Sequence, residues 1–163
     1  MKPALHFTAL TGILSFSFQR KNLILRYSLL SLSKSGSLIY AEILNLFNQV
    51  NMANVYGVKI PKSEGRAGMV AFNCELKEFK WSDFSKFVAE KLPKYAQPIF
   101  IRIIKELETT GTFKLKKNDL REEAYHLDKI KGDQIYIKKP GNSSYEVLDR
   151  SYYDIIMSGE AGF

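Results

Sequence analysis

The chain has 163 residues, of which 45% are hydrophobic and 25% are charged, and this composition is typical of one globular domain rather than a fibrous or disordered chain. A single cysteine, Cys74, excludes an internal disulfide, and with only two histidines we expect no structural zinc site and no bound metal. No run of about 18 apolar residues occurs, so the sequence predicts no membrane-spanning helix.

The net charge of +7 is concentrated near the N-terminus. Residues 1–40 hold five of the 24 basic residues and no Asp or Glu, whereas the remainder holds 19 basic and 17 acidic residues. Because nucleic-acid binding depends on a surplus of basic groups, this near balance argues against a nucleic-acid partner. A small basic protein that binds nucleic acid or an anionic membrane is the alternative function.

Residues 1–39 form a leader that is rich in serine, contains arginine and lacks acidic residues. This composition is typical of an organelle transit peptide. We favour instead a displaced start or a disrupted reading frame, in which case the leader has no relation to the domain behind it. We expect the leader to be poorly ordered and the domain to occupy residues 40–163.

The regular pattern begins after the leader. Apolar residues at helical spacing, the last of them Leu46 and Phe47, predict a short helix over residues 40–49. Residues 53–60 are rich in β-branched and aromatic side chains and predict a strand, as do residues 69–74. Glycines between the two strands favour a tight connection, so the strands are expected to pair.

The second half of the pattern predicts the middle of a sheet. Ser82 is expected to cap a helix whose apolar stripe includes Phe84 and which stops at Pro93. Residues 98–104 are almost continuously apolar, which predicts a central strand covered on both faces. A short helix, a hairpin around residues 140–144 and a final helix complete the order. The sequence thus predicts an α+β domain, a small and mostly antiparallel sheet with packed helices, preceded by the irregular leader.

The segment most suggestive of chemistry comes directly after the expected central strand. Thr110, Gly111 and Thr112 precede Lys114, so backbone amides and an ammonium group could meet an anion such as a phosphate or a carboxylate. The spacing is not that of a P-loop. A lysine run on a solvated face explains the same residues, so both interpretations stand at this point.

Three other positions carry weaker signals. His126 has no second histidine at metal spacing and is expected to play a structural or surface role. Cys74 is interpreted as a small buried apolar residue. Glu64 and Arg66 flank Gly65 in a turn, where either a local ion pair or a ligand contact fits the pattern.

Three stretches, in order, are similar to one known family. They are residues 54–69 (NVYGVKIPKSEGRAGM), residues 92–102 (LPKYAQPIFIR) and residues 106–114 (ELETTGTFK). They closely resemble the C-terminal domain of long-chain and very-long-chain fatty acyl-CoA synthetases, in the branch also called fatty acid transport proteins, within the adenylate-forming, AMP-binding enzymes. The resemblance runs from about Tyr40 to the C-terminus.

The resemblance implies a two-step ligase. A fatty acid reacts with ATP to give an acyl-adenylate and pyrophosphate, and CoA then displaces AMP to form the thioester. In such enzymes a large N-terminal adenylation domain binds ATP, Mg²⁺ and the acyl chain, and a small C-terminal domain turns over it as a lid between the steps. Lys114 aligns with the family's catalytic lysine, and Thr110, Gly111 and Thr112 lie beside it on the nucleotide side.

The resemblance also assigns the turn of Glu64, Gly65, Arg66 and Gly68 to the CoA side. The family's N-terminal domain and the hinge expected before Tyr40 have no counterpart in the sequence. We therefore expect a lid that is inactive alone, binds no cofactor by itself and has an adenylation domain as its partner. ATP, AMP and CoA would serve the intact enzyme, whose substrates are fatty acid and CoA. The expected location is cytoplasmic, with peripheral membrane association as a further option.

Overall fold

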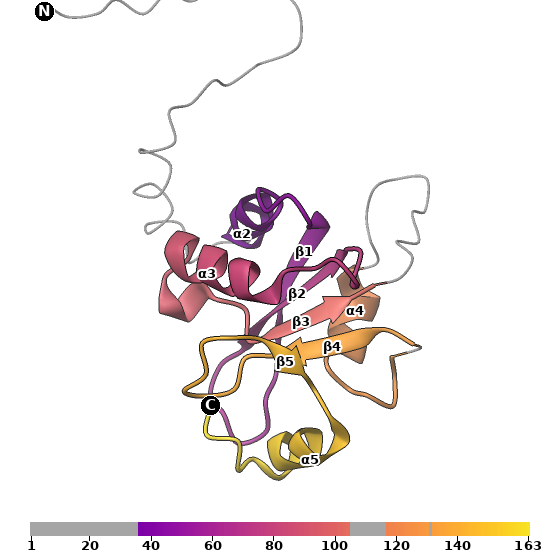
Figure 1. Cartoon of the computed structure of the whole chain (residues 1–163). Helices are drawn as coiled ribbons and strands as arrows, with labels where there is room; N and C mark the ends of the chain where they lie inside the picture. The colour runs from indigo at the N-terminus through magenta and orange to yellow at the C-terminus, as the bar shows by residue number, and fades with distance from the viewer. Residues whose placement is uncertain (1–35, 105–116, 131) are drawn as a thin grey trace, which may run out of the picture.

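The computed structural model describes residues 36–104, 117–130 and 132–163, and Figure 1 shows their arrangement. Most of the predicted leader therefore lies outside the described residues. The described elements are α2 (Gly36–Leu44), β1 (Asn51–Val58), β2 (Ala67–Asn73), α3 (Trp81–Lys91), the 3-10 helix η1 (Lys94–Ala96), β3 (Phe100–Ile103), α4 (Lys117–Glu123), β4 (Gln134–Ile137), β5 (Glu146–Val147) and α5 (Arg150–Ser158). Their order is the predicted one.

The strands of the described residues form one sheet in the order β1-β2-β3-β4-β5, with β3 in the middle as predicted. Neighbouring strands are antiparallel except β2 and β3, which are parallel with Val70 opposite Ile101. A parallel pair needs a crossover connection, and α3 with η1 supplies it. The predicted α+β class, a small and mostly antiparallel sheet with packed helices, is confirmed.

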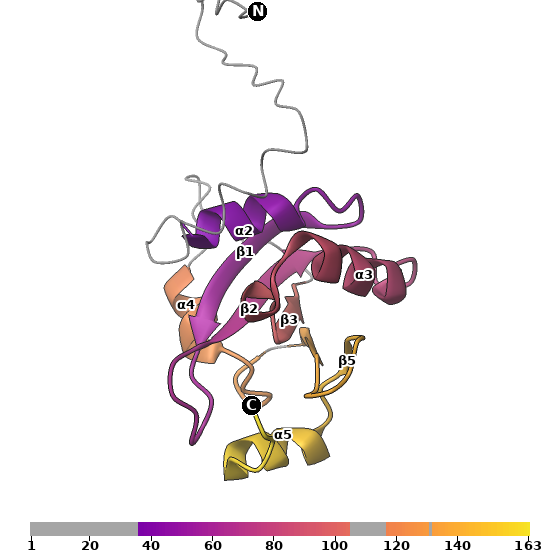
Figure 2. The ribbon, with the colours of Figure 1, turned by 90° about the vertical axis from the view of Figure 1, so that its left-hand side faces the viewer.

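Helices cover both faces of the sheet. Successive residues of β3 point to opposite sides, so each face of this strand packs against a different set of helices. Phe100 packs in an apolar cluster with residues of α4 and α5, whereas Ile101 packs in a second cluster with residues of α2 and α3. Figure 2 shows α3 and α4 on opposite sides of the sheet. All four residues of β3 are buried, which explains the nearly continuous apolar pattern of this strand.

Aromatic rings hold α3 on the sheet. Phe84 of α3 is fully buried, and its ring centroid lies 5.2 Å from that of Phe47 and 5.7 Å from that of Phe72. The ring of Tyr145, next to β5, lies 5.9 Å away. Residues distant in the sequence therefore meet around one phenylalanine, and this side chain is the centre of the cluster on that face of the sheet.

The predicted cap of α3 is wrong. The helix begins at Trp81, one residue before Ser82, and no side chain caps it. Instead, the side chain of Gln49 accepts a 3.0 Å hydrogen bond from the backbone N–H of Lys80, the residue at the cap position. The start of this helix is thus held by a distant segment, and the predicted local serine cap is absent.

The first helix also departs from its prediction. α2 begins at Gly36, within the segment predicted as leader, and ends at Leu44 rather than after Phe47. Asn45 explains the early end, because its side-chain oxygen accepts a 2.7 Å hydrogen bond from a backbone N–H of β1 and draws the chain toward the sheet. Phe47 still packs in the core from the turn that follows, whereas Leu46 is 66% exposed.

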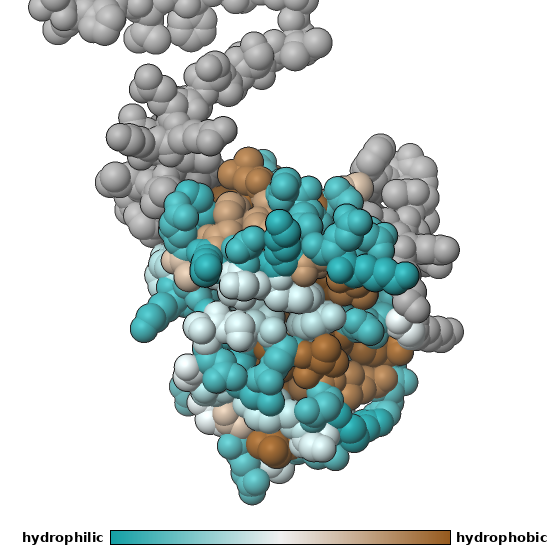
Figure 3. All heavy atoms as spheres, viewed as in Figure 1, coloured by the Kyte–Doolittle hydropathy of each residue, from teal (hydrophilic) through white to brown (hydrophobic). Residues whose placement is uncertain are grey.

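The surface carries scattered apolar side chains. In the view of Figure 3, one group of hydrophobic residues lies over α2, where Leu38 is 63% exposed. Single exposed apolar residues are normal for a folded domain. None of the helices in the described ranges combines the length and the apolar character that a membrane crossing requires.

Candidate functional site

The first predicted site is one exposed turn. β1 and β2 pair antiparallel, and residues 59–66 connect them. Glu64 and Arg66 are exposed on either side of Gly65, whose φ of 91° lies in the left-handed region that glycine adopts without strain. Gly68 follows inside β2. The structure therefore brings these four predicted residues together at one end of the sheet, which we call the turn end.

The side chain of Arg66 lies back against β1. A Cβ atom on Gly57 would come within 3.1 Å of Cβ and Cδ of Arg66, so the glycine leaves room for this side chain. Arg66 Nη1 also donates a 3.3 Å hydrogen bond to the Gly57 carbonyl. A pair between Arg66 and Glu64 is absent from the ion pairs of the described residues. The guanidinium has five N–H donors, so the exposed ones remain available to an anion such as a phosphate.

Gly68 lies where the crossover connection meets β2. A Cβ atom on Gly68 would lie 3.6 Å from Pro98 Cα, and the Gly68 carbonyl accepts a 2.8 Å hydrogen bond from the Ile99 N–H. Tyr145 fixes the same place, because its hydroxyl donates to the Pro98 carbonyl at 2.7 Å. Burial raises the pKa of this hydroxyl, which keeps it protonated as a donor. The turn end is therefore a rigid support for the exposed turn.

The second predicted site follows β3 in the chain. β2 and β3 are parallel, so both begin at the turn end and both finish at the other end. Lys114, together with Thr110, Gly111 and Thr112, lies outside the described residues. Their described neighbours are Ile104, which follows β3, and the first residue of α4. The connection that carries Lys114 thus leaves the sheet opposite the turn end.

Sequence reasoning missed a buried charged group in β3. Arg102 of β3 is 6% exposed, and it donates from Nε to Asp133 Oδ2 at 2.7 Å and from Nη1 to Glu123 Oε2 at 2.6 Å. Burial works to lower the pKa of Arg102, but the hydrogen bonds to Glu123 and Asp133 outweigh it and the net change is upward. A lone arginine inside an apolar strand was the available signal, because a buried charge requires a partner.

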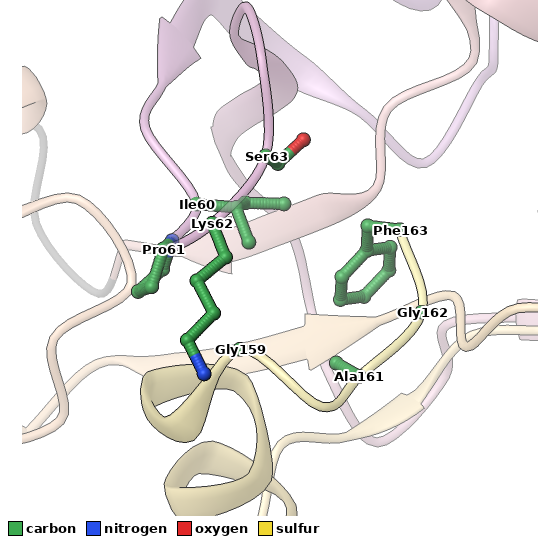
Figure 4. A pocket seen from close by; sticks show the side chains of 8 residues that line it. All are labelled: Ile60, Pro61, Lys62, Ser63, Gly159, Ala161, Gly162 and Phe163. Atoms are coloured by element: carbon green, nitrogen blue, oxygen red, sulfur yellow. The ribbon is translucent and has the colours of Figure 1, made fainter.

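A small hollow lies beside the turn end, between residues 60–63 and the segment that follows α5 (Figure 4). Lys62 extends toward Gly159 there, and a Cβ atom on Gly159 would lie 2.6 Å from Lys62 Cδ. The volume of about 60 Å³ has room for one or two water molecules, and none for a nucleotide or a pantetheine group. An organic ligand at the turn end would therefore need a second surface to enclose it.

Cys74 follows β2 and is half-buried. Burial, with a smaller contribution from Glu75, raises the pKa of its thiol to about 11. We expect iodoacetamide at neutral pH to alkylate Cys74 about 100-fold more slowly than a free cysteine, because the reactive thiolate is that much rarer. Mass spectrometry of the native chain would measure the rate, with the urea-denatured chain as the control. Equal rates in the two states would contradict this expectation.

Comparisons with known proteins agree with the motifs, although no family model matches the chain. Long-chain fatty acid transport protein 6 of Mus musculus is 43% identical over 123 residues, which cover 74% of this chain and 19% of that protein. The very long-chain fatty acid transport protein of Cochliobolus heterostrophus is 35% identical over 111 residues, or 64% of this chain and 17% of that protein. A medium/long-chain-fatty-acid–CoA ligase of Mycobacterium tuberculosis is 42% identical over 80 residues, or 48% and 13%.

These matches define first a class, that of the fatty acyl-CoA ligases and their relatives. The chain is homologous to a long-chain fatty acid transport protein over 74% of its length, as its motifs predict. The chain spans about a fifth of the length of these relatives. The structure of a fatty acyl CoA synthetase of Mycobacterium tuberculosis can be superimposed on 52% of this chain and 17% of the solved chain, with 18% sequence identity and a TM-score of 0.47. The sequence matches alone carry the relationship.

Proposed function

We propose that this chain acts as the C-terminal lid domain of a fatty acyl-CoA ligase, which activates long-chain fatty acids with ATP to acyl-adenylates and then to acyl-CoA. The observation that carries the proposal is the 43% identity over 123 residues with a long-chain fatty acid transport protein. The hollow beside the turn end has a volume of about 60 Å³, which is too small for a nucleotide, and we propose that an adenylation domain binds ATP, Mg²⁺ and the acyl chain. That domain is the proposed partner.

In this proposal Lys114 is the catalytic residue of the first step. A carboxylate that attacks a phosphate brings negative charges together, and an ammonium group held nearby offsets the charge that develops in the transition state. Thr110, Gly111 and Thr112 would contribute hydroxyl and amide donors to the nucleotide. ATP supplies the adenylyl group, since the carboxylate attacks the α-phosphate and pyrophosphate leaves, and Mg²⁺ held by the adenylation domain would neutralise the remaining phosphate charge.

The turn end is proposed to serve the second step, on the CoA side. Arg66 has exposed N–H groups that suit a phosphate or an amide carbonyl, and Gly65 lets the backbone come close to a ligand. The exposed turn lies where β2 begins, and the chain leaves the parallel strand β3 toward Lys114 at the opposite end of the sheet. In the proposal the lid turns as a body between the ATP step and the CoA step.

The proposed location follows from the substrates. ATP and CoA are drawn from the cytoplasm, and long-chain fatty acids partition into membranes. We therefore propose a cytoplasmic protein whose assembled ligase contacts a membrane surface peripherally. The cofactors belong to the assembled enzyme, and the lid alone is not expected to retain them.

A chimera tests the proposal. The full 163-residue chain replaces the matching segment of the mouse relative, and oleoyl-CoA formation is measured with oleate, ATP, Mg²⁺ and CoA. We expect the chimera to make oleoyl-CoA, and we expect neither this chain alone nor the mouse protein without its segment to do so. The mouse protein with its own segment restored is the control. Turnover by this chain alone, or a chimera no better than the truncated relative, would contradict the proposal.

A further inference from the structure

Lys62 lies in the exposed turn with an uncommon backbone conformation. Its φ of 58° falls in the left-handed region, which a residue with a Cβ atom adopts only at a cost in free energy. Gly65 in the same turn has a positive φ as well, but glycine accepts it without strain. A left-handed lysine persists only where the surrounding structure holds it. The contacts that hold Lys62 therefore also hold the shape of the turn.

The side chain of Lys62 lies over the end of α5. Figure 4 shows it extended toward Gly159, the residue that caps this helix. A Cβ atom on Gly159 would lie 2.6, 2.8 and 3.1 Å from Cδ, Cγ and Cβ of Lys62, so the stem of the lysine fits there only because Gly159 has no side chain. We call this arrangement the Lys62–Gly159 contact.

The charge of Lys62 suits the same place. The Gly159 N–H donates to the Ile156 carbonyl at 3.0 Å, which is a common glycine end of a helix. The last turn of α5 contains no basic residue, although the negative end of the helix dipole lies there and stabilises a cation. Lys62 thus brings to this end of α5 a positive charge that the helix itself lacks.

The segment that follows α5 is itself held on the sheet. Ala161 and Phe163 pack against the apolar cluster that includes Ile60, and the ring centroid of Phe163 lies 6.2 Å from that of Phe100 in β3. The same segment and residues 60–63 enclose the small hollow beside the turn end. The contact at the end of α5 therefore links the turn to a segment whose position the sheet fixes.

We propose that Lys62 is a positioning residue for CoA binding, because its contact with Gly159 holds the turn in the shape that presents Arg66 to the ligand. This inference rests on the proposed CoA role of the turn end. A turn that is already held loses less conformational entropy on binding than a turn that the ligand must order. Without the contact, the left-handed backbone at Lys62 relaxes and the turn takes several conformations.

The substitution Gly159→Ala tests the proposal, because the added Cβ atom displaces the side chain of Lys62. Thioester formation by the chimera from synthetic oleoyl-adenylate is measured at a series of CoA concentrations. We expect the KM for CoA to rise about three- to tenfold and kcat to change less than about twofold, since CoA then has to order the turn. Acyl-adenylate formation from oleate and ATP should also change less than about twofold.

Gly141→Ala is the matched control. Gly141 lies between β4 and β5 with a φ of 82°, so alanine there introduces a similar backbone strain, but its Cβ atom would meet nothing within 4 Å. It should change neither KM nor kcat. Equal effects of Gly159→Ala and Gly141→Ala, or a loss in kcat without a rise in KM, would overturn the proposal.

Lys62→Gly removes the contact from its other side, and glycine accepts the φ of this position without strain. It should raise the KM for CoA as Gly159→Ala does, and it also serves as the test if Gly159→Ala does not fold. The two substitutions together should raise the KM no further than either alone, because both remove the same contact. Fully additive effects would overturn the proposal.

Trypsin cleavage of the full chain alone separates this inference from the proposed function. Ala67 pairs with Val58 in the sheet, so cleavage after Arg66 requires this end of the turn to open. We expect Gly159→Ala and Lys62→Gly to speed this cleavage several-fold. Mass spectrometry of the fragments gives the initial rate at each site.

Cleavage after Lys86 in α3 is the internal reference, and it should not change in any variant. Gly141→Ala should leave cleavage after Arg66 unchanged as well. An equal increase at Lys86 would mean that the whole fold is weakened, and it would overturn the proposal. If the chimera with the unaltered chain forms no thioester, the proposed function fails, while the cleavage rates still decide whether Lys62 holds the turn.

Discussion

Replacing Lys114 with alanine should lower acyl-adenylate formation by the chimera about 10²- to 10³-fold. The ammonium group is proposed to offset charge that develops as the fatty acid carboxylate attacks the phosphate, and alanine leaves that charge uncompensated. Pyrophosphate release with oleate, ATP and Mg²⁺ measures this step. Thioester formation from a synthetic acyl-adenylate should continue at the rate of the unaltered chimera, because the lysine acts only in the first step.

The matched control for this result is Lys116→Ala. It removes the same charge two residues further along the chain, and it should leave adenylation within about threefold of the unaltered rate, because the proposal gives Lys116 no role in catalysis. A Lys114→Ala chimera that is as active as the unaltered chimera would show that Lys114 has no catalytic role. Equal losses for the two lysines would point to a general effect of positive charge instead.

The substitution Phe84→Ala should destabilise the fold by about 3–5 kcal/mol, because it empties the centre of the aromatic cluster. Phe84 is fully buried, and the rings of Phe47, Phe72 and Tyr145 surround it. A loss of this size is a large share of the roughly 5–15 kcal/mol that stabilises a domain. Urea unfolding followed by circular dichroism measures the free energy of unfolding of the two chains.

Phe87→Ala provides the comparison within the same helix. Phe87 is only half-buried, and its ring contacts that of Phe47 with centroids 5.4 Å apart. Its removal should cost less than half as much free energy as removal of Phe84, because water already reaches part of the ring. If both substitutions had the same effect, or if Phe84→Ala cost under about 1 kcal/mol, the cluster would not be the centre of this core.

The parts of the fold that depend on local signals can be predicted from the sequence. The apolar run of residues 98–104 predicts a central strand, and the structure confirms it with β3. The turn-forming residues 140–144 predict a hairpin, and β4 and β5 pair antiparallel around them. His126 has the structural contact expected of it, with Nδ1 3.0 Å from the Tyr153 hydroxyl. The central strand and the hairpin are each encoded within a few residues of where they form, whereas the partner of His126 lies 27 residues further along the chain.

Features that depend on distant partners could not be predicted in this way. Lys80, at the N-terminus of α3, donates its N–H to the side chain of Gln49, 31 residues earlier, and Ser82 does not cap the helix. The partners of Arg102 lie 21 and 31 residues further along the chain. Spacing rules describe neighbours on one helix or strand, so they do not show which carboxylate will meet a given arginine.

The candidate site also has a part that is encoded locally and a part that depends on distant partners. The turn around Gly65 is a local pattern, and the structure places its predicted residues together at the turn end. The roles of Arg66 toward CoA and of Lys114 toward ATP stay predictions, because each would depend on a second domain. When two domains form one site, each sequence contains only some of the site residues. The role of those residues is then predicted from the resemblance to a family.

The irregular start of β1 has a consequence for contacts between copies of this chain. β1 is an outer strand of the described sheet, so one row of its backbone N–H and C=O groups faces no neighbouring strand. Such a row invites a second chain to add a strand and aggregate. The register shift between Asn51 and Asn54, with Met52 at a φ of 49°, bends the start of that row out of line. An intruding strand would find few matched groups there, which protects this edge of the sheet from self-association.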